Sequence, residues 1–305
     1  MALHSQSTTT QPRFSVGQWV YVRPAAEIES TLDGEQCLEG MPFMPEMRRF
    51  CGKRFRIERW ATNVCLQGVA VRFSTLDDCL ILDTPRCNGE HHGGCQMGCR
   101  FFWKSRWLDA DGSSVSESQD EEPIIPPVPV ALLGESDEYR CQATQLGLAV
   151  RKQTTARVER LRTEHHLNGL AIGSLASGLC TTLLARFRGQ HAGLRGPCRR
   201  TPVTDLGLRV GEEVVVRVRS EIVATLDRNG KNRGLWFDPM MLRFCGATLA
   251  VSRRMSRFIC ERTGRMIELS VPSVVLDDLH CDGQTRQFCS RGLHFFWREC
   301  WLRRP

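Results

Sequence analysis

A glycine-rich segment with three cysteines, Arg86 to Trp103, most constrains what this chain can fold into, because its layout occurs twice. His280 to Trp297 repeats it 194 positions later, with Cys281 in the place of Cys87. Glycine permits positive φ and close backbone approach, which a loop folded around a central group requires. The sequence therefore predicts a duplicated module centred on cysteine.

The repeat extends well beyond that segment. Residues 17–108 align with residues 211–302 without a gap, and 29 of the 92 aligned positions are identical. A single offset held over this length indicates internal duplication. The runs Trp19–Arg23 and Lys53–Arg59 are typical of strands, whereas the aromatic spacing between Phe101 and Leu108 favours a closing helix. We expect a mainly β fold with some α, built from two tandem copies of a small SH3-like or related β-barrel.

Composition changes between the two copies. Residues 109–138 hold nine acidic side chains and no basic one, and the prolines of this segment favour an extended chain that cannot bury a core. The segment that follows is basic and compatible with helix. The expected organisation is a flexible tail at 1–16, the first module at 17–108, a disordered acidic linker at 109–138, a basic helical segment at 139–200 and the second module at 201–305.

The charge distribution indicates which classes of partner the protein could bind. The formal charge is +7, and without the acidic linker it would be +16. Such an excess fits a protein partner, an anionic membrane surface or, less well, nucleic acid, but a solvated basic surface has the same composition. Leu167 to Ala185 is uncharged and near the length of a membrane span, yet too polar for one. We expect Leu167 to Ala185 to form a buried or interfacial helix flanked by arginines, and residues 139–200 to associate with an anionic membrane surface.

Cysteine usage indicates a reducing compartment. The chain has 15 cysteines, and residues 1–15 are polar, without the apolar core of a secretory signal. Thiols rather than disulfides are expected in the cytoplasm, and the odd number of cysteines agrees. We expect a cytoplasmic protein, peripheral to the membrane if residues 139–200 bind one.

Repeated thiols are the strongest chemical signal. Clustered thiolates suit zinc and, less well here, an iron–sulfur cluster, although plain burial or a disulfide also explains cysteines. His294 could replace the ligand lost where Leu293 stands for Cys99. His91 and His92 are either substitute ligands or exposed loop residues, and unmatched cysteines such as Cys141 are expected to be small buried hydrophobes. The predicted metal ligands are Cys51, Cys87, Cys95, Cys99, Cys245, Cys281, Cys289 and His294.

Motifs typical of enzymes do not appear in the sequence: it has no phosphate-binding loop, dinucleotide fingerprint, nucleophile elbow or metalloprotease histidine pair. No catalytic residue can be assigned. We expect a metal-binding accessory or adaptor protein that acts through protein–protein contacts. The alternatives are an iron–sulfur or thiol-dependent redox or sulfur-handling enzyme, with its reactive site in the second copy, and a basic nucleic-acid-binding protein.

Several segments resemble a family of duplicated, cysteine-rich bacterial proteins to which no activity is assigned. The resemblance is carried by Glu221–Gly230, by Arg-Phe-Cys-Gly at 243–246, by the Cys-x-Gly loop and by Phe-Trp-Arg-Glu-x-Trp-Leu at 296–302. It covers both copies and weakens between them. Members of that family tend to be encoded near biosynthetic genes, so the resemblance implies a bacterial cytosolic protein that assists a biosynthetic pathway.

Overall fold

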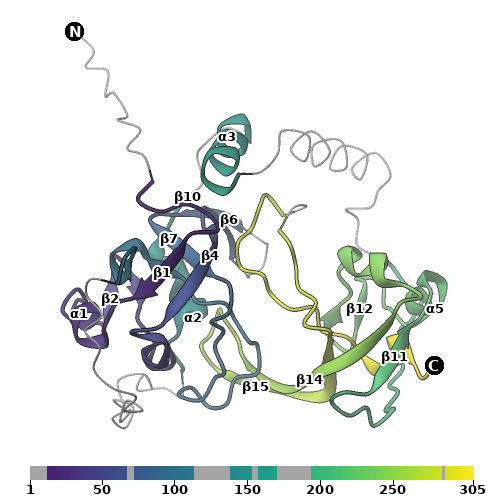
Figure 1. The fold of residues 1–305 in the computed structure, drawn as a ribbon. Helices are drawn as coiled ribbons and strands as arrows, with labels where there is room; N and C mark the ends of the chain where they lie inside the picture. The colour runs from purple at the N-terminus through teal and green to yellow at the C-terminus, as the bar shows by residue number, and fades with distance from the viewer. Residues whose placement is uncertain (1–11, 67–71, 113–137, 153–156, 170–193, 284–285) are drawn as a thin grey trace.

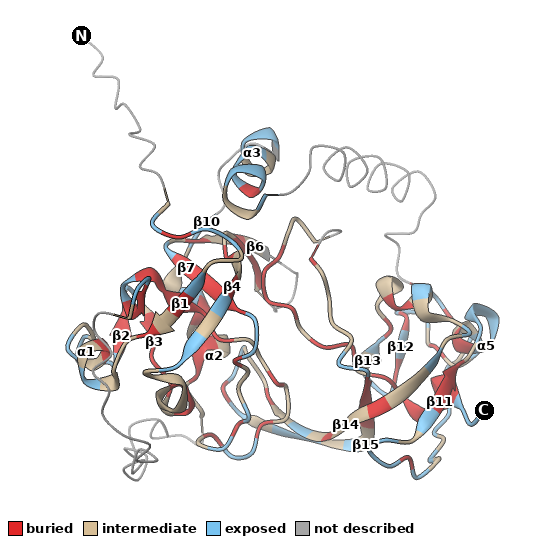
Figure 2. Cartoon of the chain, viewed as in Figure 1, coloured by how far each residue is buried: buried red, intermediate tan, exposed pale blue. Residues whose placement is uncertain are grey.

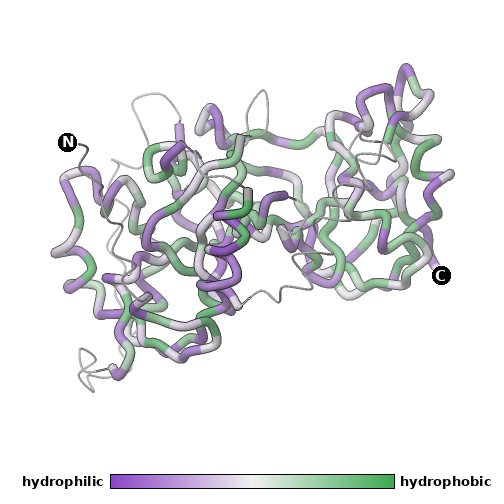
Figure 3. Tube along the Cα trace, turned by 90° about the horizontal axis from the view of Figure 1, so that it is seen from above, coloured by the Kyte–Doolittle hydropathy of each residue, from purple (hydrophilic) through white to green (hydrophobic). Residues whose placement is uncertain are grey.

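The computed structural model describes residues 12–66, 72–112, 138–152, 157–169, 194–283 and 286–305. They form two lobes, an N-lobe from residues 12–169 and a C-lobe from residues 194–305 (Figure 1). The hairpin of β14 (Thr248–Ile259) and β15 (Met266–Leu276) extends from the C-lobe to the N-lobe. Seen from above, the same two lobes are evident, and apolar stretches run through both (Figure 3).

The N-lobe contains a five-stranded sheet in the order β8-β7-β4-β1-β9 and a three-stranded sheet in the order β10-β6-β5. Its elements are β1 (Trp19–Val22), α1 (Ala25–Glu29), β2 (Cys37–Leu38), β3 (Met41–Pro42), the 3₁₀ helix η1 (Pro45–Phe50), β4 (Arg54–Trp60), β5 (Asn63–Leu66), β6 (Arg72–Leu76), β7 (Cys79–Leu82), β8 (Trp103–Lys104), η2 (Ser105–Trp107), β9 (Leu108–Asp109), α2 (Gln142–Ala149), β10 (Val150–Lys152) and α3 (Arg157–Asn168).

The C-lobe is built on an antiparallel sheet in the order β15-β14-β11-β16, with a separate β12–β13 hairpin. Besides β14 and β15, its elements are β11 (Glu213–Val216), α5 (Arg219–Ala224), β12 (Lys231–Asn232), β13 (Leu235–Trp236), η4 (Pro239–Phe244), η5 (Glu299–Trp301) and β16 (Leu302–Arg303). The described chain is thus mainly β, with several small sheets and short helices.

Each lobe has its own apolar core, and buried residues concentrate inside both (Figure 2). Trp103 and Trp107 are fully buried in the N-lobe, as are Trp297 and Trp301 in the C-lobe. Indole rings of this size supply much of the buried apolar area of a small core. Phe14 is also 1% exposed, so the N-lobe begins within the segment expected to be a flexible tail.

Hydrogen bonds recur at the offset of the sequence repeat. Trp107 Nε1 donates to Thr31 Oγ1 over 3.2 Å, and Trp301 Nε1 donates to Thr225 Oγ1 over 2.9 Å. The N–H groups of Gly52 and Gly246 likewise donate to matching strands, β1 and β11. The matching contacts agree with the sequence repeat, whereas the expected SH3-like barrel and its tandem duplication stay predictions.

The expected closing helix is wrong. Residues 101–108 form the short strand β8, one 3₁₀ turn at η2 and the start of β9. Phe101, Phe102 and Trp103 are all at most 3% exposed, although consecutive residues of a surface helix cannot all face a core. An extended segment buried on both sides explains the aromatic run.

The segment between the lobes is described only in part. It contains α2, β10 and α3, so the helical expectation for residues 139–200 holds for two stretches, and β10 pairs with β6 of the N-lobe. Leu167 to Ala185 lies mostly outside the described residues, as does most of the acidic linker. Within the described chain, every helix is too short or too polar to cross a membrane.

The two lobes contact each other through their cysteine loops, residues 87–99 and 281–293. The backbone N–H of Ile259 on β14 donates to Cys95 Sγ over 3.4 Å, and the N–H of Cys65 on β5 donates to Cys289 Sγ over 3.2 Å. Each loop thus packs against a strand of the opposite lobe. The two contacts are related by the 194-residue offset.

Candidate metal centre

The cysteine loop of the N-lobe is closed at its base and crosses over itself. The Cys87 N–H donates to the Cys99 carbonyl over 2.8 Å, so the two ends of the loop lie side by side. Gly89 has φ +74°, and a side chain there would clash with the backbone of Cys95. Because only glycine fits this crossing, the sequence of the loop itself brings its thiols together.

Three potential metal ligands meet beside the loop. Glu46 comes from η1, Cys87 and His92 come from the loop, and their ligand atoms all lie within 4.8 Å of one another. Cys87 Sγ lies 3.3 Å from His92 Nε2, and His92 Nδ1 lies 2.7 Å from Glu46 Oε1. Glu46 and His92 are each 2% exposed, so the imidazole is held between a carboxylate and a thiol away from solvent.

Glu46 keeps its charge although it is buried. Burial raises the pKa of this carboxyl, but the contact with His92 and backbone N–H donors outweigh burial and hold the pKa below its ordinary value. Its second oxygen, Oε2, is buried and has no hydrogen-bond partner within the described residues. A buried oxygen without a partner is costly, and a bound cation would satisfy it.

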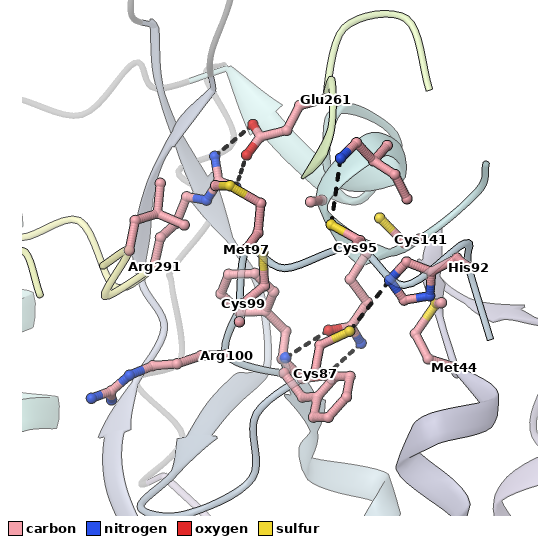
Figure 4. A pocket seen from close by; sticks show the side chains of 17 residues that line it. Met44, Cys87, His92, Cys95, Met97, Cys99, Arg100, Cys141, Glu261 and Arg291 are labelled. Carbon is pink, nitrogen blue, oxygen red and sulfur yellow. Dashed lines mark hydrogen bonds and ion pairs between the residues drawn. The ribbon is translucent and has the colours of Figure 1, made fainter. Parts of the chain in front are cut away.

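A small cavity of about 40 Å³ adjoins this group (Figure 4). Four cysteines line it: Cys87, Cys95 and Cys99 belong to the loop, and Cys141 directly precedes α2. In Figure 4, Cys87, Cys95 and Cys141 lie on the same side of the cavity as His92. Of these thiols, that of Cys87 belongs to the ligand group, and the other three line the same cavity.

Burial keeps these thiols protonated when no metal is bound. It raises the pKa of Cys99 to about 12 and also raises the pKa values of Cys87, Cys95 and Cys141. Backbone N–H groups of Met97 and of the opposite lobe lower the pKa of Cys95, because such donors stabilise a thiolate. A metal ion would displace the thiol protons, so loading of the site would depend on pH.

The C-lobe supplies the far wall of the cavity. Glu261 and Arg291 both line it, and Arg291 Nη1 donates to Glu261 Oε2 over 2.8 Å. The Arg291 side chain is 4% exposed, so this ion pair is nearly dry. The attraction of the carboxylate raises the pKa of Arg291 against burial, which lowers it. Both lobes thus assemble the candidate centre.

The sequence-predicted ligands of the first copy separate into two groups. Cys87, Cys95 and Cys99 line one cavity, but Cys51 belongs neither to this lining nor to the ligand group. Cys51 ends η1, and its thiol points back to the Met47 carbonyl at 3.9 Å. The glycine that follows it, which recurs with it, forms a turn with φ +72°.

The four ligands predicted in the second copy are not brought together. Cys281 Sγ contacts Met240 Sδ at 3.9 Å, and Cys289 Sγ contacts Cys65 Sγ of the N-lobe at 3.3 Å. His294 packs against a neighbouring imidazole, and Cys245 ends η4. Within the described residues, Glu46, Cys87 and His92 form the one group of three potential metal ligands.

Substitutions at the matching positions explain this difference. Arg286 stands where the first copy has His92, and Met240 stands where it has Glu46. Arg286 forms an ion pair with Asp238. The second copy thus has a guanidinium at the sequence position where the first copy has an imidazole. A guanidinium cannot ligate a metal, because it has no acceptor and stays protonated. The four ligands predicted in the second copy therefore do not form a metal site among the described residues.

Sequence reasoning missed three members of the centre. It left His92 undecided, it interpreted Cys141 as a buried hydrophobe, and it did not consider Glu46. Glu46 and Cys141 lie far from the loop along the chain, and no local spacing marks them as ligands. The short spacing of five residues between Cys87 and His92 is the local signal that could have identified His92 as a ligand.

Comparison of the chain with protein families, with curated proteins and with solved structures gave no match. The chemistry of the site must therefore be inferred from its own geometry.

Proposed function

We propose that the protein binds zinc in the N-lobe and that Cys87 and His92 are the first two ligands. The buried Glu46–Cys87–His92 group carries this proposal. Because Nδ1 of the imidazole faces a carboxylate, Nε2 is left free for the metal, as in the carboxylate–histidine–zinc arrangement. The remaining ligands come from the other thiols of the cavity, Cys95, Cys99 and Cys141.

The size and the ligand types of the cavity favour zinc over an iron–sulfur cluster. A volume of about 40 Å³ suits one ion and little else. A mixed set of thiolate and imidazole ligands is typical of zinc, whereas iron–sulfur clusters take mainly cysteine. Enough thiols are present to close a four-coordinate site, and closed zinc sites are structural.

A structural zinc at this place would fix the surface on which both lobes meet. We therefore propose an accessory or adaptor role, in which the metal stabilises a protein that acts through contacts with other proteins. The family resemblance supports a bacterial biosynthetic pathway as the setting. The recurrence of hydrogen bonds at the 194-residue offset supports two copies of one small β-barrel module, of which the first kept the metal.

A second candidate is thiol chemistry at Cys87. Thiol, imidazole and carboxylate lie in series at 3.3 Å and 2.7 Å, the order of nucleophile, base and orienting group. Against it, burial and nearby acidic groups raise the pKa of Cys87, and a reactive cysteine needs a lowered one. Alkylation by iodoacetamide separates the two: a zinc-bound thiol is protected until a chelator removes the metal, whereas a nucleophile reacts in metal-free and metal-loaded protein alike.

The decisive test compares variants of cysteines inside and outside the centre. Zinc content after purification, measured by plasma mass spectrometry, should be close to one per chain for the unaltered protein. Cys87→Ser should lose it, while Cys51→Ser and the second-copy variant Cys281→Ser should retain it. Zinc retained by Cys87→Ser, or lost equally by all three variants, contradicts the proposed centre.

A further inference from the structure

Three arginines and two histidines meet where the ends of the two cysteine loops come together. Arg86 and Arg100 flank the first loop, and His280 and His294 occupy the matching positions of the second. Each pair is joined by an isolated antiparallel β-bridge. Arg253 of β14 lies beside them, and a side chain at Gly98 would clash with its guanidinium. The cluster thus contains residues of both lobes.

The contacts within the cluster leave most of its charge uncompensated. Arg100 forms an ion pair with Glu58, and its Nη2 lies 3.2 Å from His280 Nε2. Arg86 donates only to carbonyl oxygens, one of them that of Gly98 at 2.9 Å. Of the three guanidinium groups, that of Arg100 alone forms an ion pair with a carboxylate of the described residues. Asp278 also interacts with Arg253, but its side chain is exposed.

Several donors of the cluster have no partner. Nε and Nη2 of Arg253, Nε of Arg100 and Nδ1 of His294 are buried atoms without a hydrogen bond to any described residue. His294 is 5% exposed, and the side chain of Arg100 is 10% exposed. Buried polar groups in native proteins almost always have a partner. These unpaired atoms belong to three neighbouring residues of one cluster, so the cluster as a whole lacks an acceptor.

The charge of that partner follows from the chemistry of arginine. Guanidinium groups stay protonated in proteins, so the cluster cannot relieve itself by losing a proton. Arg86 and Arg253 both contact Gly98: Arg86 donates to its carbonyl, and the Arg253 guanidinium packs against its Cα, so the like charges lie close together. Buried like charges are costly unless a counter-charge lies between them. The partner must be an anion.

We propose that this cluster binds a phosphate group, either free or as a phosphomonoester, at the junction of the two lobes. Planar guanidinium forks match the oxygens of phosphate, and an anion of charge near −2 balances the excess of three arginines over one paired carboxylate. His280 and His294 add donors from the second lobe. The bound anion joins residues at the ends of both cysteine loops and so links the two lobes.

The site is tested by calorimetric titration with inorganic phosphate, a simple phosphomonoester and sulfate, each against chloride at matched ionic strength. Phosphate or the monoester should bind and raise the melting temperature. Arg253→Met should weaken binding about tenfold or more, equivalent to about 1.4 kcal/mol. Arg257→Met is the matched control, because Arg257 lies on the same strand, is 45% exposed in its side chain and pairs with Glu268.

Further arms keep the test decisive. His294→Gln, which adds no bulk, replaces Arg253→Met if that variant fails to fold. The titration is repeated on Cys87→Ser, which should bind phosphate as tightly as the unaltered protein does, because the proposed anion site is separate from the metal centre. Tighter binding of the monoester indicates an organic phosphate as ligand, and tighter binding of inorganic phosphate indicates the free ion. Binding no stronger than that of chloride, or equal affinities of the Arg253 and Arg257 variants, overturns the proposal.

Discussion

Replacing Glu46 by glutamine removes one negative charge from the proposed zinc centre with little change in shape. Glutamine can still accept hydrogen bonds through its carbonyl oxygen, so the imidazole of His92 stays in place. What is lost is the charge that makes its Nε2 a stronger ligand. Glu46→Gln therefore tests the electrostatic contribution of the carboxylate rather than the packing of the site.

The size of the effect follows from the geometry. A hydrogen bond to a charged group contributes about 1.5–3 kcal/mol, compared with about 0.5–1.5 kcal/mol for a neutral one. Glu46 lies 2.7 Å from His92 Nδ1 and is 2% exposed, so solvent screens little of this difference. We expect zinc affinity to fall about tenfold, or about 1.4 kcal/mol. Metal-free protein should lose no more stability than this, because the glutamine carbonyl oxygen can still accept the backbone N–H of His91.

Zinc affinity is measured by competition with a chromogenic chelator, and stability by urea unfolding with and without zinc. Glu90→Gln is the control, because Glu90 is an exposed residue of the same loop and contacts only Asn88 among the described residues. Equal zinc affinities of Glu46→Gln and the unaltered protein would refute the role of the carboxylate. A large loss of stability in metal-free Glu46→Gln would show instead that Glu46 serves the fold.

Three further outcomes follow from buried groups. Arg291→Met leaves Glu261 buried without its partner and should cost about 3–5 kcal/mol of unfolding free energy in urea, and adding Glu261→Gln should restore most of it. Burial and the neighbouring arginines lower the pKa of His294 to about 3, so below pH 6.5 the unfolded chain takes up a proton that the folded chain does not. The free energy of unfolding in phosphate-free buffer should therefore fall by up to about 2 kcal/mol between pH 6.5 and pH 5. His294→Gln should lack this part of the pH dependence. Cys65 and Cys289, with sulfurs 3.3 Å apart, should form a disulfide with hydrogen peroxide, two thiols and one peroxide giving one disulfide and two waters, and peptide mapping should find this link in the unaltered protein but not in Cys65→Ser.

Local sequence signals predicted the parts of the structure that depend on local geometry. The strands β1 and β4 were expected from alternating apolar residues, and both occur within a residue or two of the predicted bounds. The gathering of Cys87, Cys95 and Cys99 was predictable because glycine and short spacing force a tight loop. These features require no knowledge of which distant segments meet.

The remaining ligands could not be predicted, because they reach the loop through tertiary packing. Glu46 lies on a 3₁₀ helix and Cys141 precedes a helix beyond the acidic linker, and their approach to His92 depends on how these elements pack against the N-lobe. Cys51 misled the prediction for the opposite reason. It recurs together with Gly52, whose N–H donates to β1, and repetition along the chain does not distinguish a residue of a shared turn from a ligand.

X-ray absorption at the zinc edge of the purified protein tests the proposed centre most directly, because it reports which atoms surround the metal. We expect a mixed shell with sulfur at about 2.3 Å and nitrogen at about 2.0 Å. The nitrogen component should disappear in His92→Ala, and Cys87→Ser should lower the sulfur component or abolish zinc binding. Protein that contains no zinc, or a zinc shell unchanged by both substitutions, would contradict a metal centre at Cys87 and His92.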